Sequence, residues 1–401
     1  MRQWNIYTPE GMQDLLFERC HFKRSLESNI RRLFMQSGYM EIETPTVEFY
    51  DVFSGNLIPQ EDMFKFTDPQ GRILVLRPDM TIPVARVVAT KIKDDLWPVK
   101  IFYIGNTFSY NEVGGGKQKE YTQAGVEILG ISSPEADAEL ISLAIQALQK
   151  AGLEKFQVDI GQVDFFRGLM EQSGLSEFEA EEIRELIDKK DYVGVEQLVN
   201  SHDIDPELKE LILNLPGYFG STDVIEKLAT KKVSGKALRA LEYLKKVLEI
   251  LEDWGFGDYV SIDLGMVQRL NYYTGIVFRG FTYGVGYPVL SGGRYDNLLR
   301  RFGKECPATG FSLGINMIMT ALERQNKLAC PFSCDYYIIY DKNARKKAFS
   351  VLNALRQNGE TAELDIASMD IEKARIYARN KGIRKIISID RDGNTEIIEV
   401  G

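Results

Sequence analysis

The first regular pattern of hydrophobic and polar positions is helical and covers residues 18–37. Apolar side chains recur there at spacings of three and four residues, as they do on one face of an α-helix. These side chains are Phe22, Leu26, Ile30, Leu33 and Phe34. Gly38 follows in the position where a left-handed glycine commonly ends a helix. We therefore predict that the helix stops there.

β-rich runs dominate the next part of the chain and predict a sheet. Residues 39–53 read as an extended segment that Pro45 interrupts. Strands are expected at 64–66, 73–76, 100–108, 121–129, 156–160, 259–264, 272–278 and 289–290. Helices are expected to begin near Thr81 and to cover residues 134–151 and 314–324.

Residues 165–255 have a different character, because their apolar residues follow helical spacing throughout. The clearest series is Leu238, Leu241, Leu244, Leu248 and Leu251. We predict that this stretch is a helical insertion in a mixed-sheet α+β domain of residues 1–327.

The last part of the chain alternates between strand and helix patterns after a patternless linker at 328–334. Strands are expected at 336–340, 362–366 and 386–389, helices at 344–357 and 371–380, and a final strand after a turn at 390–394. This order predicts a small α/β domain over residues 328–401 that ends in a hairpin.

Composition narrows the class of protein. The chain has 401 residues, 44% hydrophobic and 27% charged, with a net charge of −9. These values are ordinary for a globular protein and exclude a disordered or collagen-like chain. No apolar run reaches the length of a membrane span, and residues 1–14 do not resemble a signal peptide. We expect a cytoplasmic protein without a membrane segment.

The few cysteines and histidines argue against metal or histidine-based catalysis. None of the four cysteines forms a C-x-x-C pair, so a disulfide framework or zinc site is not expected. His21 lies on a predicted helix, and His202 stands between Ser201 and Asp203. Because neighbouring residues are expected to point in different directions, we predict that this string is not a catalytic triad.

Two glycine clusters could suggest nucleotide binding, but neither completes a motif. The run 114–116 precedes Lys117 and Gln118, so a phosphate-loop pattern is absent. Gly284 and Gly286 lack the third glycine of a dinucleotide fingerprint. We predict loops at both places and no cofactor.

Several strings occur in the order found in the catalytic core of histidyl-tRNA synthetase, a class II aminoacyl-tRNA synthetase. They are residues 8–14, 38–45 (resembling motif 1, a dimer-interface element), 77–81 (R-P-D-M-T), 108–127 (motif 2), 270–275 (L-N-Y-Y-T-G), and 291–296 with 310–314 (motif 3). Each string alone is weak evidence, but together they resemble the family's core over most of the chain. The resemblance implies a class II synthetase-like fold, and the tail loosely resembles a shortened anticodon-binding domain.

The residues that would drive amino-acid activation depart from the family's pattern. The resemblance places arginines at three positions that here are Ser109, Gln268 and Met317, and a glutamate at Asn111. Serine, glutamine and methionine do not replace the two-pronged contact of a guanidinium with phosphate. We therefore expect no adenylation. Arg269 could substitute for the residue at 268 only if a bulge turned it inward.

The resemblance implies that the histidine pocket is better preserved. By the family's pattern, Asp79, Thr81 and Gln123 would hold the α-amino and carboxylate end of histidine. Glu127 and Tyr273 would hold the imidazole, with Tyr272 beside them. A histidine ligand needs an acceptor for its ammonium, an acceptor for one ring N–H and a hydroxyl for the other ring nitrogen, and this set supplies all three. Asp79 stands where the family has the longer glutamate.

A histidine pocket without activating cations resembles the regulatory subunits of ATP phosphoribosyltransferase, a family related to histidyl-tRNA synthetase. The resemblance implies no catalysis by the chain alone, a dimer, and a partner, the short-form catalytic subunit at the first step of L-histidine biosynthesis. It also implies activation of that subunit and feedback inhibition by L-histidine.

Three alternatives remain open from the sequence. The chain could be an authentic histidyl-tRNA synthetase, which Ser109, Gln268 and Met317 disfavour. It could be a tRNA-binding or dimerisation module that keeps only the fold. The acidic balance and near-neutral tail disfavour tRNA binding. It could also bind a different small molecule, for which Asp79 leaves room.

Overall fold

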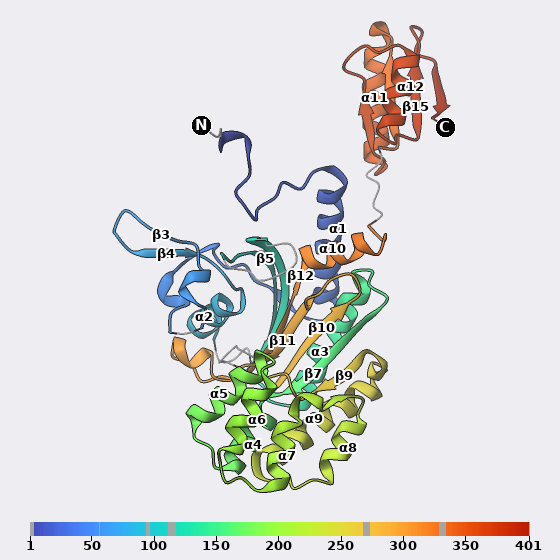
Figure 1. Cartoon of the computed structure of the whole chain (residues 1–401). Coiled ribbons are helices and arrows are strands. Elements are labelled where there is room, and N and C mark those ends of the chain that lie inside the picture. Colours follow the sequence, from blue (N-terminus) through green and yellow to red (C-terminus); the bar gives the residue numbers. More distant parts are fainter. Residues whose placement is uncertain are drawn as a thin grey trace. The chain divides into compact units, whose positions relative to one another are not determined.

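The computed structural model describes residues 4–55, 57–93, 97–110, 118–267, 273–328 and 334–400 (Figure 1). The chain divides into two compact units. The larger contains Met1–Asp14 and Lys23–Leu328, and the smaller contains Leu15–Phe22 and Ala329–Gly401.

A nine-stranded mixed sheet forms the centre of the larger unit, in the order β1-β5-β6-β12-β11-β10-β7-β9-β8. The strands are β1 (Met40–Glu41), β5 (Val99–Phe108), β6 (Glu120–Leu129), β12 (Ala308–Gly314), β11 (Leu290–Arg294), β10 (Ile276–Thr282), β7 (Phe156–Gln162), β9 (Val260–Asp263) and β8 (Phe219–Gly220). All pairs from β5 to β7 are antiparallel, whereas β1 pairs with β5 and β7 with β9 in parallel. The α+β prediction for this region is confirmed.

Two long helices cover one face of this sheet (Figure 1). From α1 (Phe17–Gln36), Phe34 packs its ring against Phe102 and Phe311. The second helix, α3 (Pro134–Lys150), packs on β11 and β12. Because the helices bury this face, the polar side chains that point the other way form the face that carries the candidate site.

The end of α1 shows how a single residue sets a boundary. Gly38 has φ +84°, and its N–H donates to the carbonyl of Met35. The next N–H, of Tyr39, donates to the carbonyl of Phe34. This bonding pattern pairs the last carbonyls of the helix and favours glycine at the left-handed position, so the predicted helix end is confirmed.

A smaller sheet, in the order β2-β4-β3, lies between β1 and β5 in the sequence. Its strands are β2 (Val47–Phe49), β3 (Lys65–Thr67) and β4 (Ile73–Leu76). The chain then enters α2 (Thr81–Lys91), whose first turn carries predicted site residues. The helix α10 (Ile315–Arg324) follows β12 directly.

The predicted helical insertion is present. Its helices are α4 (Val163–Ser173), α5 (Glu177–Asp188), α6 (Tyr192–Asn200), α7 (Pro206–Leu213), α8 (Asp223–Ala229) and α9 (Gly235–Asp253). Gly168 lies where α4 crosses α9, and a side chain there would overlap with the backbone of Ala237. The two-residue strand β8 interrupts the helices and was not predicted.

The strands around the candidate site differ from their predicted bounds. β10 begins at Ile276, not at residue 272, and β11 continues to Arg294. β12 was not predicted as a strand. Its sequence gives a weak strand signal, because Gly310 and Ser312 have low strand propensity. Both residues are nevertheless paired with β6 and β11 in the sheet. Ladder pairing therefore overrides the low strand propensity of these residues.

The smaller unit is the predicted α/β arrangement. Its sheet has the order β14-β13-β15-β16, with helices α11 (Arg345–Gln357) and α12 (Ile371–Asn380). The strands are β13 (Tyr336–Tyr340), β14 (Ala362–Leu364), β15 (Lys385–Ile389) and β16 (Thr395–Glu399). The pair β15–β16 is antiparallel and forms the predicted terminal hairpin, whereas β13 is parallel to β14 and β15.

His202 follows α6 in the insertion, and both of its ring nitrogens are bound. Nε2 lies 2.6 Å from Oε1 of Glu179, and Nδ1 lies 3.0 Å from the carbonyl of Leu198. The hydroxyl of Ser201 lies 3.1 Å from Nδ1 and donates to the same carbonyl at 2.7 Å. The prediction that Ser201 and His202 point apart is therefore wrong, because the end of α6 turns both toward Leu198. An Nδ1 that donates to a carbonyl is no base for Ser201, so the group is structural.

We expect the Glu179–His202 contact to stabilise the insertion most between pH 4.5 and 6.5. The carbonyl of Leu198 and Glu179 raise the pKa of His202 above 6.5, so this stabilisation is lost as the pH rises through the raised pKa. Ser176 and His202 lower the pKa of Glu179 to about 2. The stabilisation contributed by the ionised Glu179 is therefore lost only as the pH falls from 4.5 toward that value.

In His202→Ala, amide protection in α5 and α6 should fall at about pH 6 and approach that of the wild type at about pH 8.5. Hydrogen exchange followed by mass spectrometry measures this. Lys189→Ala, which breaks an exposed pair with Glu185, is the matched control and should show no such pH dependence. Equal protection of variant and wild type at the lower pH would contradict the assignment.

Candidate functional site

The centre of the candidate site is a buried carboxylate. Glu127 on β6 is 1% exposed, and it accepts hydrogen bonds from the hydroxyls of Tyr295 at 2.6 Å and Tyr103 at 3.2 Å. The hydroxyl of Thr81 also bonds to it. Burial raises the pKa of Glu127 to about 8, against these hydrogen bonds and with a contribution from the charge of Asp79. An unliganded Glu127 is therefore largely protonated at neutral pH.

Two glycines make the space in which this carboxylate lies. A side chain at Gly310 on β12 would overlap with Oε2 of Glu127. A Cβ at Gly293 on β11 would lie 2.9 Å from the ring of Tyr273. Because Gly293 and Gly310 are cross-strand neighbours, the carboxylate of Glu127 and the ring of Tyr273 lie over adjacent strands. Glu127 and Tyr273, which are predicted to hold an imidazole, therefore lie over two neighbouring glycines.

Asp79 lies at the start of α2, and its carboxylate bonds to that helix. Asp79 precedes the N-cap residue Met80, and its Oδ1 accepts from the N–H of Ile82 at 2.9 Å. Burial raises the pKa of Asp79 to about 6, while the backbone N–H groups of Ile82, Thr81 and Met80 act in the opposite direction. The half-buried Asp79 and the buried Glu127 thus form a pair of acids at one site.

Gln123 lies on β6 four residues before Glu127, so the two side chains share one face. Its Oε1 is buried and has no hydrogen-bond partner among the described residues. An unpaired buried acceptor costs about 1–3 kcal/mol. A ligand that supplies a donor, such as an ammonium, would remove that cost.

The helical insertion positions Tyr273. The side chain is 7% exposed, and Nη2 of Arg167 on α4 donates to the backbone carbonyl of Tyr273 at 3.1 Å. The N–H of Val163, the first residue of α4, donates to the carbonyl of Gly275 at 2.9 Å. The first helix of the insertion therefore holds the segment that brings Tyr273 to the pocket.

Comparison with known proteins agrees with this arrangement. A family model described as histidyl-tRNA synthetase matches residues 11–318. The ATP phosphoribosyltransferase regulatory subunit of Acetivibrio thermocellus is 58% identical over 399 residues, 99% of this chain and 96% of that protein. That of Ruminiclostridium cellulolyticum is 52% identical over 402 residues, 100% of this chain and 96% of that protein. The chain belongs to the family of ATP phosphoribosyltransferase regulatory subunits.

Comparison with solved structures shows that the fold of this chain is similar to that of histidyl-tRNA synthetase. An ATP phosphoribosyltransferase regulatory subunit/histidyl-tRNA synthetase from Bacillus halodurans has a TM-score of 0.85 at 34% identity and covers 96% of this chain and 98% of that chain. The histidyl-tRNA synthetase of Nostoc sp. PCC 7120 has a TM-score of 0.83 at 22% identity, covering 98% and 97%. At 22% identity, the second structure shows similarity of fold alone. The predicted class II synthetase-like fold is confirmed.

Two of the positions where this regulatory-subunit chain departs from the synthetase pattern are described. Ser109 follows β5, and its N–H donates to the carbonyl of Lys119. Met317 lies in the first turn of α10, and its Cγ lies 3.4 Å from the position of a Cβ on Gly314, the cross-strand neighbour of Gln123. A thioether therefore lies near Gln123. Asn111, Gln268, Arg269 and Tyr272 lie outside the described residues, as does the predicted 114–116 loop.

The arginines that remain in the segments resembling synthetase motifs stabilise the fold. Arg77 is 5% exposed and donates to the carbonyls of Thr44 and Asn106. Arg294 is 3% exposed and pairs with Asp137 at 2.9 Å. Neither guanidinium is available to a ligand's phosphate. Within the described ranges no group of three or more potential metal ligands occurs, and no helix there has the length and hydropathy of a membrane span.

Sequence reasoning missed Tyr103 and Tyr295, the two hydroxyls on Glu127. Tyr295 lies inside the quoted string 291–296 but received no role. Tyr103 is offset by two positions from Ile101, the cross-strand partner of Glu127. The usable signal was the buried glutamate itself, because a buried carboxylate requires donors. Tyr103 on the adjacent strand β5 and Tyr295 just after β11 supply them.

Proposed function

We propose that this chain is a non-catalytic regulatory subunit that activates the short-form ATP phosphoribosyltransferase catalytic subunit and mediates its feedback inhibition by histidine, at the first step of L-histidine biosynthesis. One observation carries the proposal. The pocket pairs a buried glutamate with a buried acceptor that has no partner among the described residues, while Arg77 and Arg294 are bonded to other parts of the fold.

Histidine matches the groups of this pocket one by one. Its ammonium would donate to Oε1 of Gln123 and to Asp79, which removes the unpaired acceptor. One ring N–H would donate to Glu127, and the hydroxyl of Tyr273 would serve the other ring nitrogen. Thr81 would complete the amino-acid end.

The regulatory mechanism follows from differential binding. Histidine favours one arrangement of the complex to the extent that it binds that arrangement more tightly. The fixed position of Tyr273 on the α4 segment gives the pocket a direct mechanical connection to the helical insertion. The effector thus acts on the equilibrium between arrangements and needs no reacting group in this chain.

The deciding experiment measures phosphoribosyl-ATP synthesis by the short-form catalytic subunit with and without this chain, each titrated with L-histidine. We expect the rate to rise on adding the chain and to become inhibitable by histidine. No change in rate and no histidine effect would overturn the regulatory function. Histidine-dependent exchange of pyrophosphate into ATP by this chain alone would support a synthetase instead.

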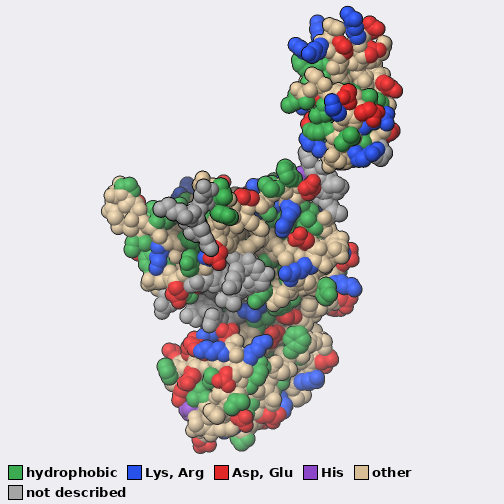
Figure 2. Space-filling view, turned by 45° about the horizontal axis from the view of Figure 1, so that its top comes forward, with side chains coloured by type: hydrophobic (Ala, Val, Ile, Leu, Met, Phe, Trp, Pro, Cys, Tyr) green, Lys and Arg blue, Asp and Glu red, His purple; other side chains and the backbone are tan. Residues whose placement is uncertain are grey.

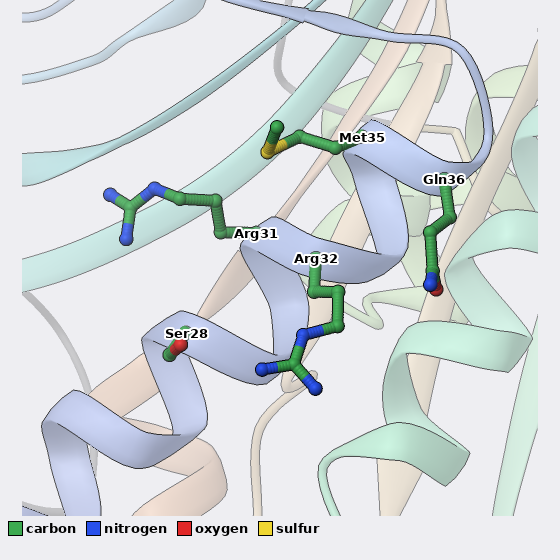
Figure 3. Close-up of a pocket in the computed structure, with 5 residues that line it drawn as sticks. All are labelled: Ser28, Arg31, Arg32, Met35 and Gln36. Carbon is green, nitrogen blue, oxygen red and sulfur yellow. The ribbon is translucent and has the colours of Figure 1, made fainter.

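We also propose that the chain forms a dimer through the face of α1. Ser28, Arg31, Arg32, Met35 and Gln36 line an open hollow there (Figure 3). Met35 is 60% exposed, and Met40 on β1 is 59% exposed. Large apolar side chains that stay exposed beside arginines are typical of protein interfaces. This face includes the string that resembles the family's dimer element.

Met35→Glu should therefore shift the chain from dimer to monomer, because a buried unpaired charge opposes association. Light scattering coupled to size-exclusion chromatography measures the mass. Phe178→Glu is the matched control, because Phe178 on α5 is 78% exposed and lies outside this face. A monomeric wild type, or a dimeric Met35→Glu variant, would contradict the interface.

A tRNA-binding role receives no support from the face drawn in Figure 2, where basic and acidic side chains are interspersed. Extended nucleic-acid binding needs a basic face that neutralises phosphates. We accordingly propose that the partner of this chain is a protein, and that both act in the cytoplasm.

A further inference from the structure

One row of cross-strand neighbours runs from the histidine pocket across the sheet. It begins at Tyr103 and continues through Gly125, Ser312, Ser291, Arg279, Asp159 and Ser261. Directly opposed residues of adjacent strands point to the same face. The row therefore lies on the face of Glu127, and its members from Ser312 to Ser261 are only half-buried. A solvent-reachable polar floor continues beyond the pocket.

Arg279 is the charged centre of this floor. Among the described residues, no hydrogen bond or ion pair within 4.0 Å is found for its guanidinium. Burial lowers the pKa of Arg279, and the charges of Tyr273, Asp188, Asp263 and Asp159 only partly oppose this. A desolvated guanidinium without direct partners is costly and is best satisfied by an anion with several acceptor oxygens.

Two of the three carboxylates that act on Arg279, those of Asp159 and Asp263, each accept one hydrogen bond from another group. Asp159 accepts a short hydrogen bond from the hydroxyl of Ser261. Asp263 accepts from the N–H of Gly265 at 3.0 Å. Both lie on the β7 and β9 side of Arg279, whereas on the β11 and β12 side the directly opposed residues are Ser291 and Ser312. An anion would therefore lie over the serines, away from the two carboxylates.

The floor begins beside the pocket, where the charge of Tyr273 acts on Arg279, and extends away from Glu127. Glu127 on β6 and Arg279 on β10 are separated by three inter-strand spacings, about 14 Å. We propose that Arg279, Ser291 and Ser312 form a second subsite, which binds the phosphate of a small phosphate monoester. One guanidinium and two hydroxyls match the three terminal oxygens of such a group. Asp159 accepts from a hydroxyl of the same ligand.

Calorimetric titration of the full chain with glycerol 3-phosphate, inorganic phosphate, acetate and glycerol tests the subsite. We expect glycerol 3-phosphate to bind most tightly, inorganic phosphate more weakly, and acetate and glycerol least. Arg279→Gln should weaken glycerol 3-phosphate binding by about tenfold or more, and Ser291→Ala with Ser312→Ala by several fold. Asp159→Asn should reduce the advantage of glycerol 3-phosphate over inorganic phosphate.

Arg324→Gln is the matched control, because Arg324 lies on α10 outside the floor, with its guanidinium on the carbonyl of Gly284. It should leave all four titrations unchanged. Histidine is titrated into the same samples, which separates the outcome from that of the proposed function: Arg279→Gln should keep wild-type histidine affinity. The subsite is overturned if neither phosphate binds at about 10 mM, if Arg279→Gln binds as the wild type does, or if acetate equals phosphate.

Discussion

Replacing Glu127 by alanine should weaken histidine binding by about 10-fold to 150-fold. A hydrogen bond to a charged group is worth about 1.5–3 kcal/mol, which converts to that range. Glu127 is the proposed acceptor for the imidazole N–H, and it already accepts hydrogen bonds from the hydroxyls of Tyr103, Tyr295 and Thr81. The measurement is histidine titration of the isolated chain by calorimetry, followed by the histidine inhibition constant of the complex.

Glu127→Gln separates the loss of charge from the loss of volume, because it keeps the shape over Gly310. It should bind histidine less tightly than the wild type but should retain the native fold. Tyr273→Phe should have a smaller effect, because it removes one neutral hydroxyl. Glu120→Gln is the matched control, since Glu120 bonds to Asn106 outside this pocket. Unchanged histidine affinity in both Glu127→Ala and Tyr273→Phe would remove the pocket assignment.

The elements with strong local signals were predictable from the sequence. The bounds of β13 and α12 match the predicted 336–340 and 371–380, because apolar periodicity and turn residues coincide there. The centre of the main sheet was not predictable in this way. In β11 and β12 the glycines exist because Glu127 and Tyr273 fill the space above them. The residue type at these positions depends on a neighbour on another strand, and the sequence alone does not show which residues are neighbours.

The same limit applies to the site. Asp79, Glu127 and Tyr273 could be identified because their strings resemble a known family, and the structure brings them to one face. Their roles in histidine binding stay predictions. Tyr103 acts across a strand register that only the folded sheet defines, and Arg279 becomes conspicuous only when its lack of direct partners is visible. Long-range pairing, not local propensity, creates both features.

Binding of histidine should release close to one proton at neutral pH. Burial holds the pKa of free Glu127 at about 8, so the group is largely protonated before the ligand arrives. In the complex it would accept one more hydrogen bond, from the ring N–H, in addition to those from the hydroxyls of Tyr295, Thr81 and Tyr103. Donors stabilise the ionised form and lower the pKa. The lost proton therefore goes to solvent.

Linkage then sets the sign of the pH dependence: a proton released on binding makes affinity rise with pH until the pKa of the free group is passed. Histidine affinity should increase by about 20-fold between pH 6.5 and 8.5. Asp79, whose pKa is raised to about 6, adds to the loss of affinity only at the acid end of this range. Calorimetry in buffers of different ionisation enthalpy measures the proton count directly. In Glu127→Gln the release should disappear, since no carboxyl remains there to ionise. If wild type and Glu127→Gln released the same number of protons, the proton would not come from Glu127. If the wild type released none, histidine would bind as an imidazolium, with its proton shared across Glu127.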